Sequence, residues 1–143
     1  MHVNLALTQI HLRIAAALRC PSREQEHADL RALFGDNFQR LKMALESFDP
    51  ARVGGAKPLH VCPAEGGYFL VADVGMPDMD FCRRLAEETG VVCTPMSIFY
   101  AEGTTDTTCT LVRFTICKSR SHVDRAIAAL NSGKAIRITP QRE

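Results

Sequence analysis

The chain has 143 residues, of which 46% are hydrophobic and 23% charged, and 17 basic residues against 16 acidic ones leave a formal net charge of +1. These values are typical of one soluble globular domain and exclude a disordered chain. They also argue against a general nucleic-acid binder, because neutralising phosphates needs a basic excess. No apolar run approaches the ~18 residues of a membrane span, and polar residues interrupt the N-terminal apolar stretch where a signal peptide needs a continuous one. We expect no membrane association.

The cysteines form no CxxC pair and no Cys/His cluster with zinc spacing, so no metal site is predicted. The six are Cys20, Cys62, Cys82, Cys93, Cys109 and Cys117. Most lie in apolar segments such as VVCTP and FTICK, where a reduced cysteine behaves as a small hydrophobe. Buried free thiols are therefore expected, with a disulfide set or a metal site as the alternatives. Free thiols favour a reducing compartment, and we expect the cytoplasm.

Two helices are predicted in the first third of the chain. Apolar residues on one face over 5–19 predict a helix that Pro21 stops. Ser22 is a candidate N-cap for a second, long amphipathic helix that ends at Asp49-Pro50. Its apolar stripe recurs at steps of three and four residues and comprises Leu30, Leu33, Phe34, Phe38, Leu41, Leu45 and Phe48.

Four β-prone runs predict a small sheet: PLHVCP, YFLVADV, VVCTP and TLVRFTIC. Gly66-Gly67 joins the first two runs. Between the second and third runs, DFCRRLAEET predicts a helix that Asp78 or Asp80 caps and Gly90 closes. The stretches ARVGGAKP and MSIFYAEGTTDTTC are predicted as loops.

A last helix is predicted after the fourth run. Ser121 and Asp124 resemble a capping box at its start, and it ends at Gly133. Its residues Val123, Ile127 and Leu130 are expected to face the core.

The order of these elements predicts an α+β fold, with a small mixed or antiparallel sheet covered on one face by helices. Without repeats or linkers, 1–143 is interpreted as a single unit. It would consist of a helical connecting segment over 1–48, an α+β part over 49–133 and a tail over 134–143.

Arg113 is the residue that most suggests chemistry. Alternation in LVRFTIC puts it on one face of a strand with Leu111 and Thr115, while Val112 and Phe114 take the other face. A charge there must face solvent, pair with an acid or bind an anionic ligand. Its planar guanidinium suits a carboxylate, and an ordinary solvent-exposed strand face is the alternative.

Other polar and glycine-rich positions give weaker signals. Gly66-Gly67 is explained by a hairpin turn with φ > 0, or by a close approach of another group to the backbone. Asp73, at a strand end, is interpreted as a strand terminator rather than a catalytic acid. The stretch VGGAKP lacks the frame of a phosphate-binding loop.

Three segments, in order, resemble class I pyridoxal-phosphate aminotransferases. PAEGGYFLVADV resembles a strand pair of the small domain, VVCTPMSIFY the following segment, and LVRFTICKS the strand that supplies a carboxylate-binding arginine. FGDNFQRLKMALESF resembles the long connecting helix, and LALTQIHLRIAAAL a preceding helix less well. The likeness covers most of residues 3–131 and is closest to the kynurenine–oxoglutarate aminotransferase and cysteine-conjugate β-lyase group.

The resemblance implies that this is the C-terminal, small-domain part of an aminotransferase. Arg113 would bind the α-carboxylate of an amino-acid or 2-oxo-acid substrate. Gly67 would lie near the substrate entrance, with Ser97, Phe99 and Tyr100 near the active-site mouth. The substrates implied are aromatic or sulfur-containing amino acids, and the complete enzyme would be a homodimer.

The same resemblance implies pyridoxal phosphate as cofactor, held through a lysine in a motif that this chain lacks. The lysines are Lys42, Lys57, Lys118 and Lys134, and none has the expected context. We therefore expect no catalytic or cofactor-binding residue in this chain, which would be inactive alone, and a missing N-terminus that leaves a mitochondrial location open. The alternatives are a non-catalytic α+β module that binds a small carboxylate or a partner protein, and a regulatory ligand-binding domain.

Overall fold

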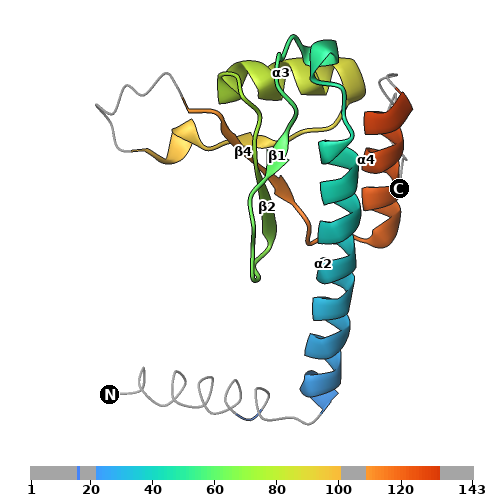
Figure 1. Cartoon of the computed structure of the whole chain (residues 1–143). Coiled ribbons are helices and arrows are strands. Elements are labelled where there is room, and N and C mark those ends of the chain that lie inside the picture. The colour runs from blue at the N-terminus through green and yellow to red at the C-terminus, as the bar shows by residue number, and fades with distance from the viewer. Residues whose placement is uncertain (1–15, 17–21, 101–108, 133–143) are drawn as a thin grey trace, which may run out of the picture. The chain divides into compact units, whose positions relative to one another are not determined.

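Figure 1 shows a computed structural model of the chain, which describes residues 16, 22–100 and 109–132. The chain divides into two compact units, residues 1–33 and residues 34–143. The interpretation of 1–143 as one unit, with parts over 1–48 and 49–133, stays a prediction. The predicted helix over 5–19, the stop at Gly133 and the tail lie outside the described residues, apart from residue 16, which is helical.

The long helix is α2, Ser22–Glu46, so Ser22 is its first residue rather than its cap. In the second unit its apolar stripe is buried at Leu41 and Leu45, and Phe48, just past the helix end, is buried with them. Leu30, in the first unit, is 46% exposed. The predicted long helix is confirmed, but its apolar stripe is not buried at every position.

The sheet is antiparallel throughout. Its strands are β1 (His60–Val61), β2 (Phe69–Asp73), β3 (Thr94–Pro95) and β4 (Leu111–Thr115), in the spatial order β1-β2-β4-β3. The central pair is β2 and β4, in a register that places Val71 opposite Arg113. This confirms the predicted sheet and decides between its two predicted forms.

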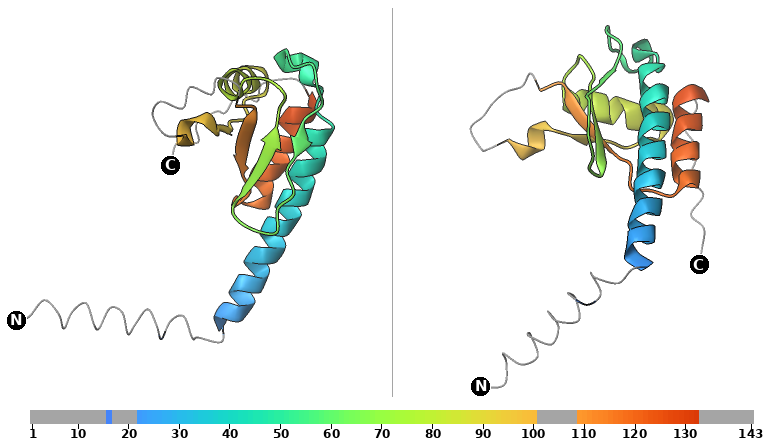
Figure 2. Two further views of the ribbon diagram at one scale, coloured as in Figure 1. Left: turned by 60° about the vertical axis from the view of Figure 1, so that its left-hand side comes forward. Right: turned by 60° about the horizontal axis from the view of Figure 1, so that its bottom comes forward.

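One face of the sheet is buried under the helices. Leu70 and Ala72 of β2 and Val112 of β4 are fully buried, while the residues between them are not. They form one core with residues of α2, of α3 (Asp78–Thr89) and of α4 (Arg120–Ser132). Figure 2 shows these helices beside the sheet in two further views. The predicted α+β fold, with helices on one face of a small sheet, is confirmed.

The two later helices begin at different places from those predicted. Pro77 occupies the N-cap position of α3, and the helix starts at Asp78. Helix α4 starts at Arg120, where the Ser119 carbonyl accepts the backbone N–H groups of His122 and Val123. The predicted cap at Ser121 is therefore two residues late.

Other local predictions are partly right. Gly90 closes α3 in the left-handed conformation, with φ 75°, as expected. The predicted loops contain two short 3-10 helices, η1 (Pro50–Val53) and η2 (Ser97–Phe99). In α4, Val123 and Leu130 are buried and Ile127 packs against the core, which confirms the predicted core face.

Asn37 of α2 connects this helix to the end of β4. Its side chain is fully buried, and its Nδ2 donates hydrogen bonds of 2.9 Å to the carbonyls of both Ile116 and Lys118. The side-chain amide thus links α2 to two carbonyls beyond the end of the strand, and the Ile116 carbonyl also accepts the backbone N–H of Lys118 at 2.9 Å.

The cysteines are less uniformly buried than expected. Among the described residues all are free thiols, but only Cys93 and Cys109 are buried; Cys62 and Cys82 are half-buried and Cys117 is exposed. Cys117 lies two residues beyond the end of β4. Within the described residues, no helix is long and apolar enough to cross a membrane.

Candidate carboxylate-binding site

Arg113 lies on the face of the sheet opposite the helical core. The alternation of β4 leaves Leu111, Arg113 and Thr115 partly exposed, while Val112 and Phe114 are buried. The predicted alternation of the strand is therefore confirmed. Its neighbours in register are Val71 of β2 and Thr94 of β3.

Two aromatic rings hold the Arg113 guanidinium. Its Cζ atom lies 4.3 Å from the centroid of Phe69 and 4.3 Å from that of Phe99. Both contacts have cation–π geometry, and stacking on rings leaves the N–H edge of a guanidinium available for hydrogen bonds. Phe69 comes from β2 and Phe99 from η2, so two segments fix the position of one charged group.

The Nε atom of Arg113 is buried and has no hydrogen-bond partner in the structure. No ion pair between described residues involves Arg113. An N–H donor that is shielded from water and unpaired costs about 1–3 kcal/mol, which binding of an acceptor recovers. A carboxylate is the acceptor that matches the fork of an arginine with two parallel hydrogen bonds.

The two aspartates of this region use their oxygens elsewhere. Asp73 Oδ1 accepts the backbone N–H of Gly75 at 2.9 Å, as expected for a residue that ends a strand. Asp78 Oδ2 accepts the backbone N–H of Ser97 at 2.7 Å, and its Oδ1 accepts the Ser97 hydroxyl at 3.0 Å. These acids are therefore engaged, and Asp78 ties the first turn of α3 to η2, which carries Phe99.

The electrostatics of Asp78 agree with this structural role. Burial opposes ionisation of its carboxyl, but hydrogen bonds from Ser97, Met79 and Cys109 outweigh it, so the pKa of Asp78 lies below its usual value. The carboxylate form is the one that accepts these bonds.

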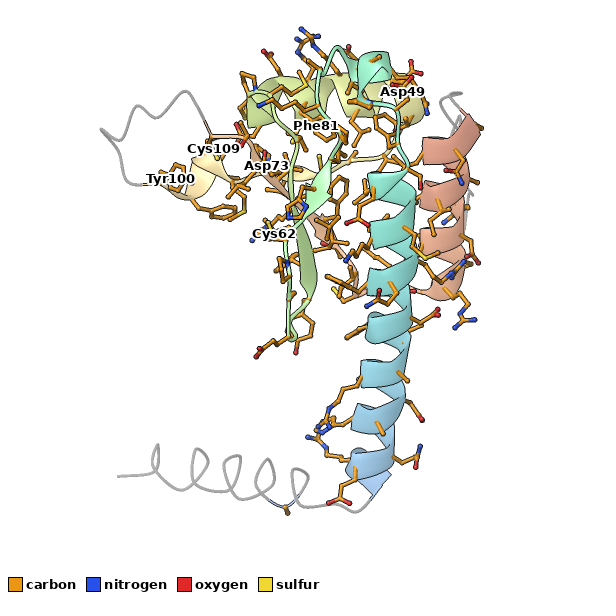
Figure 3. The ribbon with its side chains drawn as sticks, in the orientation of Figure 1. Asp49, Cys62, Asp73, Phe81, Tyr100 and Cys109 are labelled. Atoms are coloured by element: carbon orange, nitrogen blue, oxygen red, sulfur yellow. The ribbon has the colours of Figure 1, made fainter. Side chains whose placement is uncertain are left out.

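Tyr100 lies next to Cys109, and Figure 3 shows the two labelled side chains near the start of β4. The Cys109 thiol donates to the Tyr100 hydroxyl across 3.7 Å. Ser97, Phe99 and Tyr100 thus belong to one short segment, of which Phe99 contacts Arg113 directly. Ile98 and Tyr100 of this segment are 57% and 45% exposed.

Gly67 is not in contact range of Arg113 along the sheet. It precedes β2 by two residues, and four residues of strand, about 13 Å, separate it from Val71, the partner of Arg113. Its φ of 107° explains the glycine, and a Cβ there would meet no atom within 4 Å. The φ value agrees with the predicted turn, and among the described residues no group approaches the Gly67 backbone within this distance.

Two residues of this site were not predicted as part of it. The sequence pattern predicts a strand position for Phe69 and a helix cap for Asp78, and no role at the site for either. Phe69 lies two positions before Val71, the partner of Arg113, on the same face of β2, so strand pairing identifies it once the register is known. No local sequence signal links Asp78 to Ser97, 19 residues away.

The model of the family described as "Aminotransferase class I and II" matches residues 3–130 of the chain. The chain belongs to this family.

Curated relatives match shorter segments. A "Methionine aminotransferase" of Escherichia coli is 40% identical over 48 residues, which are 31% of this chain and 12% of that protein. A Mycobacterium tuberculosis protein named "Probable N-succinyldiaminopimelate aminotransferase DapC" is 41% identical over 76 residues, or 46% of this chain and 19% of that protein.

A solved structure of the N-succinyldiaminopimelate aminotransferase from M. tuberculosis superposes with a TM-score of 0.60 and 34% identity, covering 81% of this chain and 28% of that one. The E. coli methionine aminotransferase structure gives a TM-score of 0.58 and 26% identity, covering 75% and 26%. The chain therefore spans less than a third of the length of these relatives.

The family implies pyridoxal phosphate as cofactor. Its covalent attachment needs a lysine amine held at the site. Lys57 and Lys118 are exposed, and Lys42 pairs with Glu46 at 3.9 Å on the surface of α2. Lys134 lies outside the described residues. Among the described residues there is also no group of three acidic, histidine or cysteine side chains that would hold a metal ion.

Proposed function

We propose that this chain forms the substrate-carboxylate part of an aminotransferase, with Arg113 binding the α-carboxylate of an amino acid or 2-oxo acid. The observation that carries the proposal is the guanidinium held between two rings with its buried Nε unpartnered. The membership of the chain in the aminotransferase class I and II family supports such a role.

The geometry gives Arg113 two tasks. The first is affinity, because charge-assisted hydrogen bonds to a carboxylate are stronger than neutral ones, the more so where rings exclude water. The second is orientation, since a bidentate pair fixes the plane of the carboxylate and hence the direction of the Cα substituents. Ser97 acts through Asp78, which holds the segment that positions Phe99.

The substrate side chain that we propose is aromatic or sulfur-containing. Phe69, Phe99 and Tyr100 give the surroundings of Arg113 aromatic surfaces, which favour rings and thioethers. The resemblance of the Pro95-Met96-Ser97 segment to the kynurenine–oxoglutarate aminotransferase and cysteine-conjugate β-lyase group supports the same choice. We assign Gly67 to the turn at the substrate entrance.

Transamination needs groups that the described residues do not supply. We propose that pyridoxal phosphate and its lysine are held by other parts of a complete homodimeric enzyme in the cytoplasm. The 143-residue chain is then expected to bind substrate without turning it over. The alternative is a non-catalytic module that binds a carboxylate. Both hypotheses predict carboxylate binding by this chain. They differ because the alternative predicts no transaminase activity for the full-length protein that carries this segment.

Binding is tested on the 143-residue chain by NMR, following the Nε–Hε signal of Arg113 during titration with L-methionine. The matched control ligand is the amine that methionine becomes when it loses its carboxyl group. We expect methionine to move the signal and the amine to leave it in place. An equal response to both ligands would contradict carboxylate recognition.

Two variants separate the arginine from its stacking ring. Arg113→Ala removes the signal that is followed, and methionine should then no longer shift the other signals of the NMR spectrum. Phe99→Leu should keep the response but weaken binding by about 2- to 5-fold, the equivalent of one exposed cation–π contact. In a complete enzyme carrying this segment, Arg113→Lys should raise KM about 10- to 100-fold, because a lysine cannot form the bidentate pair.

A further inference from the structure

Cys82 and Cys93 form a pair of thiols that the proposed function does not use. Their Sγ atoms lie 3.2 Å apart, about 1 Å more than a disulfide bond. Cys82 is in the middle of α3, and Cys93 lies between the end of α3 and β3. The two are 11 positions apart in sequence, so their contact is made by the fold rather than by adjacent positions in the chain.

The surrounding structure holds both sulfurs in place. Asp78 and Cys82 are one helical turn apart, so they share a face of α3. Asp78 accepts hydrogen bonds from Ser97, which lies four residues after Cys93. One turn further along the helix, Cys82 contacts Cys93 itself. The segment 93–97 therefore runs back along one face of α3 and contacts it at both ends.

The sheet fixes the other side of this segment. Thr94 pairs with Arg113 and Pro95 with Val112, and the Met96 N–H donates to the Leu111 carbonyl at 3.0 Å. Cys93 is thus held between a helix and a strand, and the thiol pair is preorganised.

The two thiols differ in access and acidity. Cys82 is half-buried, whereas Cys93 is 7% exposed. The hydrogen bond from the Cys93 thiol lowers the pKa of Cys82, although burial and the charge of Asp78 oppose this. The hydrogen bond to Cys82, burial and the neighbouring sulfur raise the pKa of Cys93. The more exposed sulfur is also the better nucleophile.

We propose that Cys82 and Cys93 are a redox-sensitive site that forms a reversible intramolecular disulfide with low-molecular-weight disulfides such as oxidised glutathione as oxidant. In the first step, the Cys82 thiolate attacks one sulfur of the oxidant; the Cys82–glutathione bond forms, the oxidant's S–S bond breaks and one glutathione thiolate leaves. In the second step, Cys93 gives up its proton and attacks the Cys82 sulfur, releasing the second glutathione thiolate. The protons of the two cysteines end on the two released thiols. The protein loses two electrons and the oxidant gains them.

The disulfide would close the chain between α3 and the segment that leads into β3. Since Thr94 is the neighbour of Arg113 in the sheet, oxidation restricts the strand that borders the arginine. The oxidised form is therefore expected to show slower amide exchange over 91–97 than the reduced form.

The test equilibrates the 143-residue chain in mixtures of reduced and oxidised glutathione, quenches in acid, alkylates the free thiols and maps the peptides by mass spectrometry. We expect the main product to be a peptide pair joined through Cys82 and Cys93, two hydrogen atoms lighter than the reduced pair and restored by a dithiol reductant. A wild-type chain that retains both thiols, or that keeps glutathione on Cys82 without the crosslink, would overturn the proposal.

Single substitutions assign the order of attack. Cys93→Ala should trap glutathione on Cys82, whereas Cys82→Ala should leave Cys93 reduced. Cys117→Ala, which removes an exposed thiol, is the matched control and should form the crosslink as the wild type does. If either site variant does not fold, the mapping of the wild-type chain still decides. A crosslink that instead joins Cys62 or Cys117 to either cysteine would also count against the site.

Discussion

The carboxylate of Asp78 accepts both the backbone N–H of Ser97, at 2.7 Å, and its hydroxyl, at 3.0 Å. One buried side chain thus attaches the start of a helix to the short segment that stacks Phe99 on Arg113. The stability of the fold and the geometry of the candidate site are linked through this contact.

Removing that carboxylate should loosen the segment. We expect Asp78→Ala to lower the free energy of unfolding by about 2 kcal/mol, because Ser97 and Met79 lose their acceptor. Urea unfolding followed by circular dichroism measures this. The matched control is Asp80→Ala in the same turn, which removes a surface pair with Arg83 and should change stability by at most about 0.5 kcal/mol. Equal losses in both variants would contradict the role of Asp78.

The same contact predicts a pH dependence. The pKa values of Asp73 and Asp78 lie below their usual value. The unfolded chain therefore binds protons at a higher pH than the folded one, and the stabilisation is complete above about pH 5 and lost as the pH falls below about 4. Urea midpoints measured across this range should fall toward acid, and Asp78→Asn should reduce that fall. A wild-type midpoint that rises toward acid would have the wrong sign.

Loss of the Asn37 side-chain amide should lower the stability of the protein, and its replacement by a carboxylate should lower the stability further. Asn37→Ala removes one hydrogen bond from the Lys118 carbonyl and one from the Ile116 carbonyl, which keeps the Lys118 N–H, at a cost of about 1–2 kcal/mol. Asn37→Asp adds a buried charge facing those carbonyls and should be less stable still at neutral pH. Lowering the pH should reduce the difference in stability between the two variants, because a protonated carboxyl can donate one hydrogen bond. Gln39→Ala, at an exposed position of the same helix, is the control.

The Gly66-Gly67 pair allows a direct test of backbone strain. Gly67→Ala should destabilise the protein by about 1–2 kcal/mol, because a φ of 107° is strained for a residue with a side chain. Gly66→Ala should have almost no effect, since Gly66 does not have a positive φ and a Cβ there meets nothing within 4 Å. Thermal unfolding of the two variants distinguishes them. A Gly66 variant as unstable as the Gly67 one would show that the turn needs both glycines.

The strands and the face of Arg113 could be predicted because they depend on local alternation. A strand that buries Val112 and Phe114 necessarily turns Arg113 to the other side, whatever the rest of the fold does. The end of α3 could be predicted for the same reason. It depends only on the left-handed conformation of Gly90, which glycine adopts readily.

What could not be predicted depends on contacts distant in sequence. The stacking of Phe69 and Phe99 on Arg113 joins three segments, and the Asp78–Ser97 pair joins two. The start of α4 is ambiguous in the sequence because two serines, Ser119 and Ser121, lie close together there. The hydrogen bonds to the Ser119 carbonyl place the start of the helix at the earlier one. Leu30 continues the apolar spacing of α2, but spacing does not show where a buried surface ends.

The two outer strands of the sheet, β1 and β3, are only two residues long, and β3 includes Pro95, which has no N–H to donate. Such short edges give the backbone of another molecule little to pair with. Lengthening the sheet by strand addition is therefore disfavoured from either side.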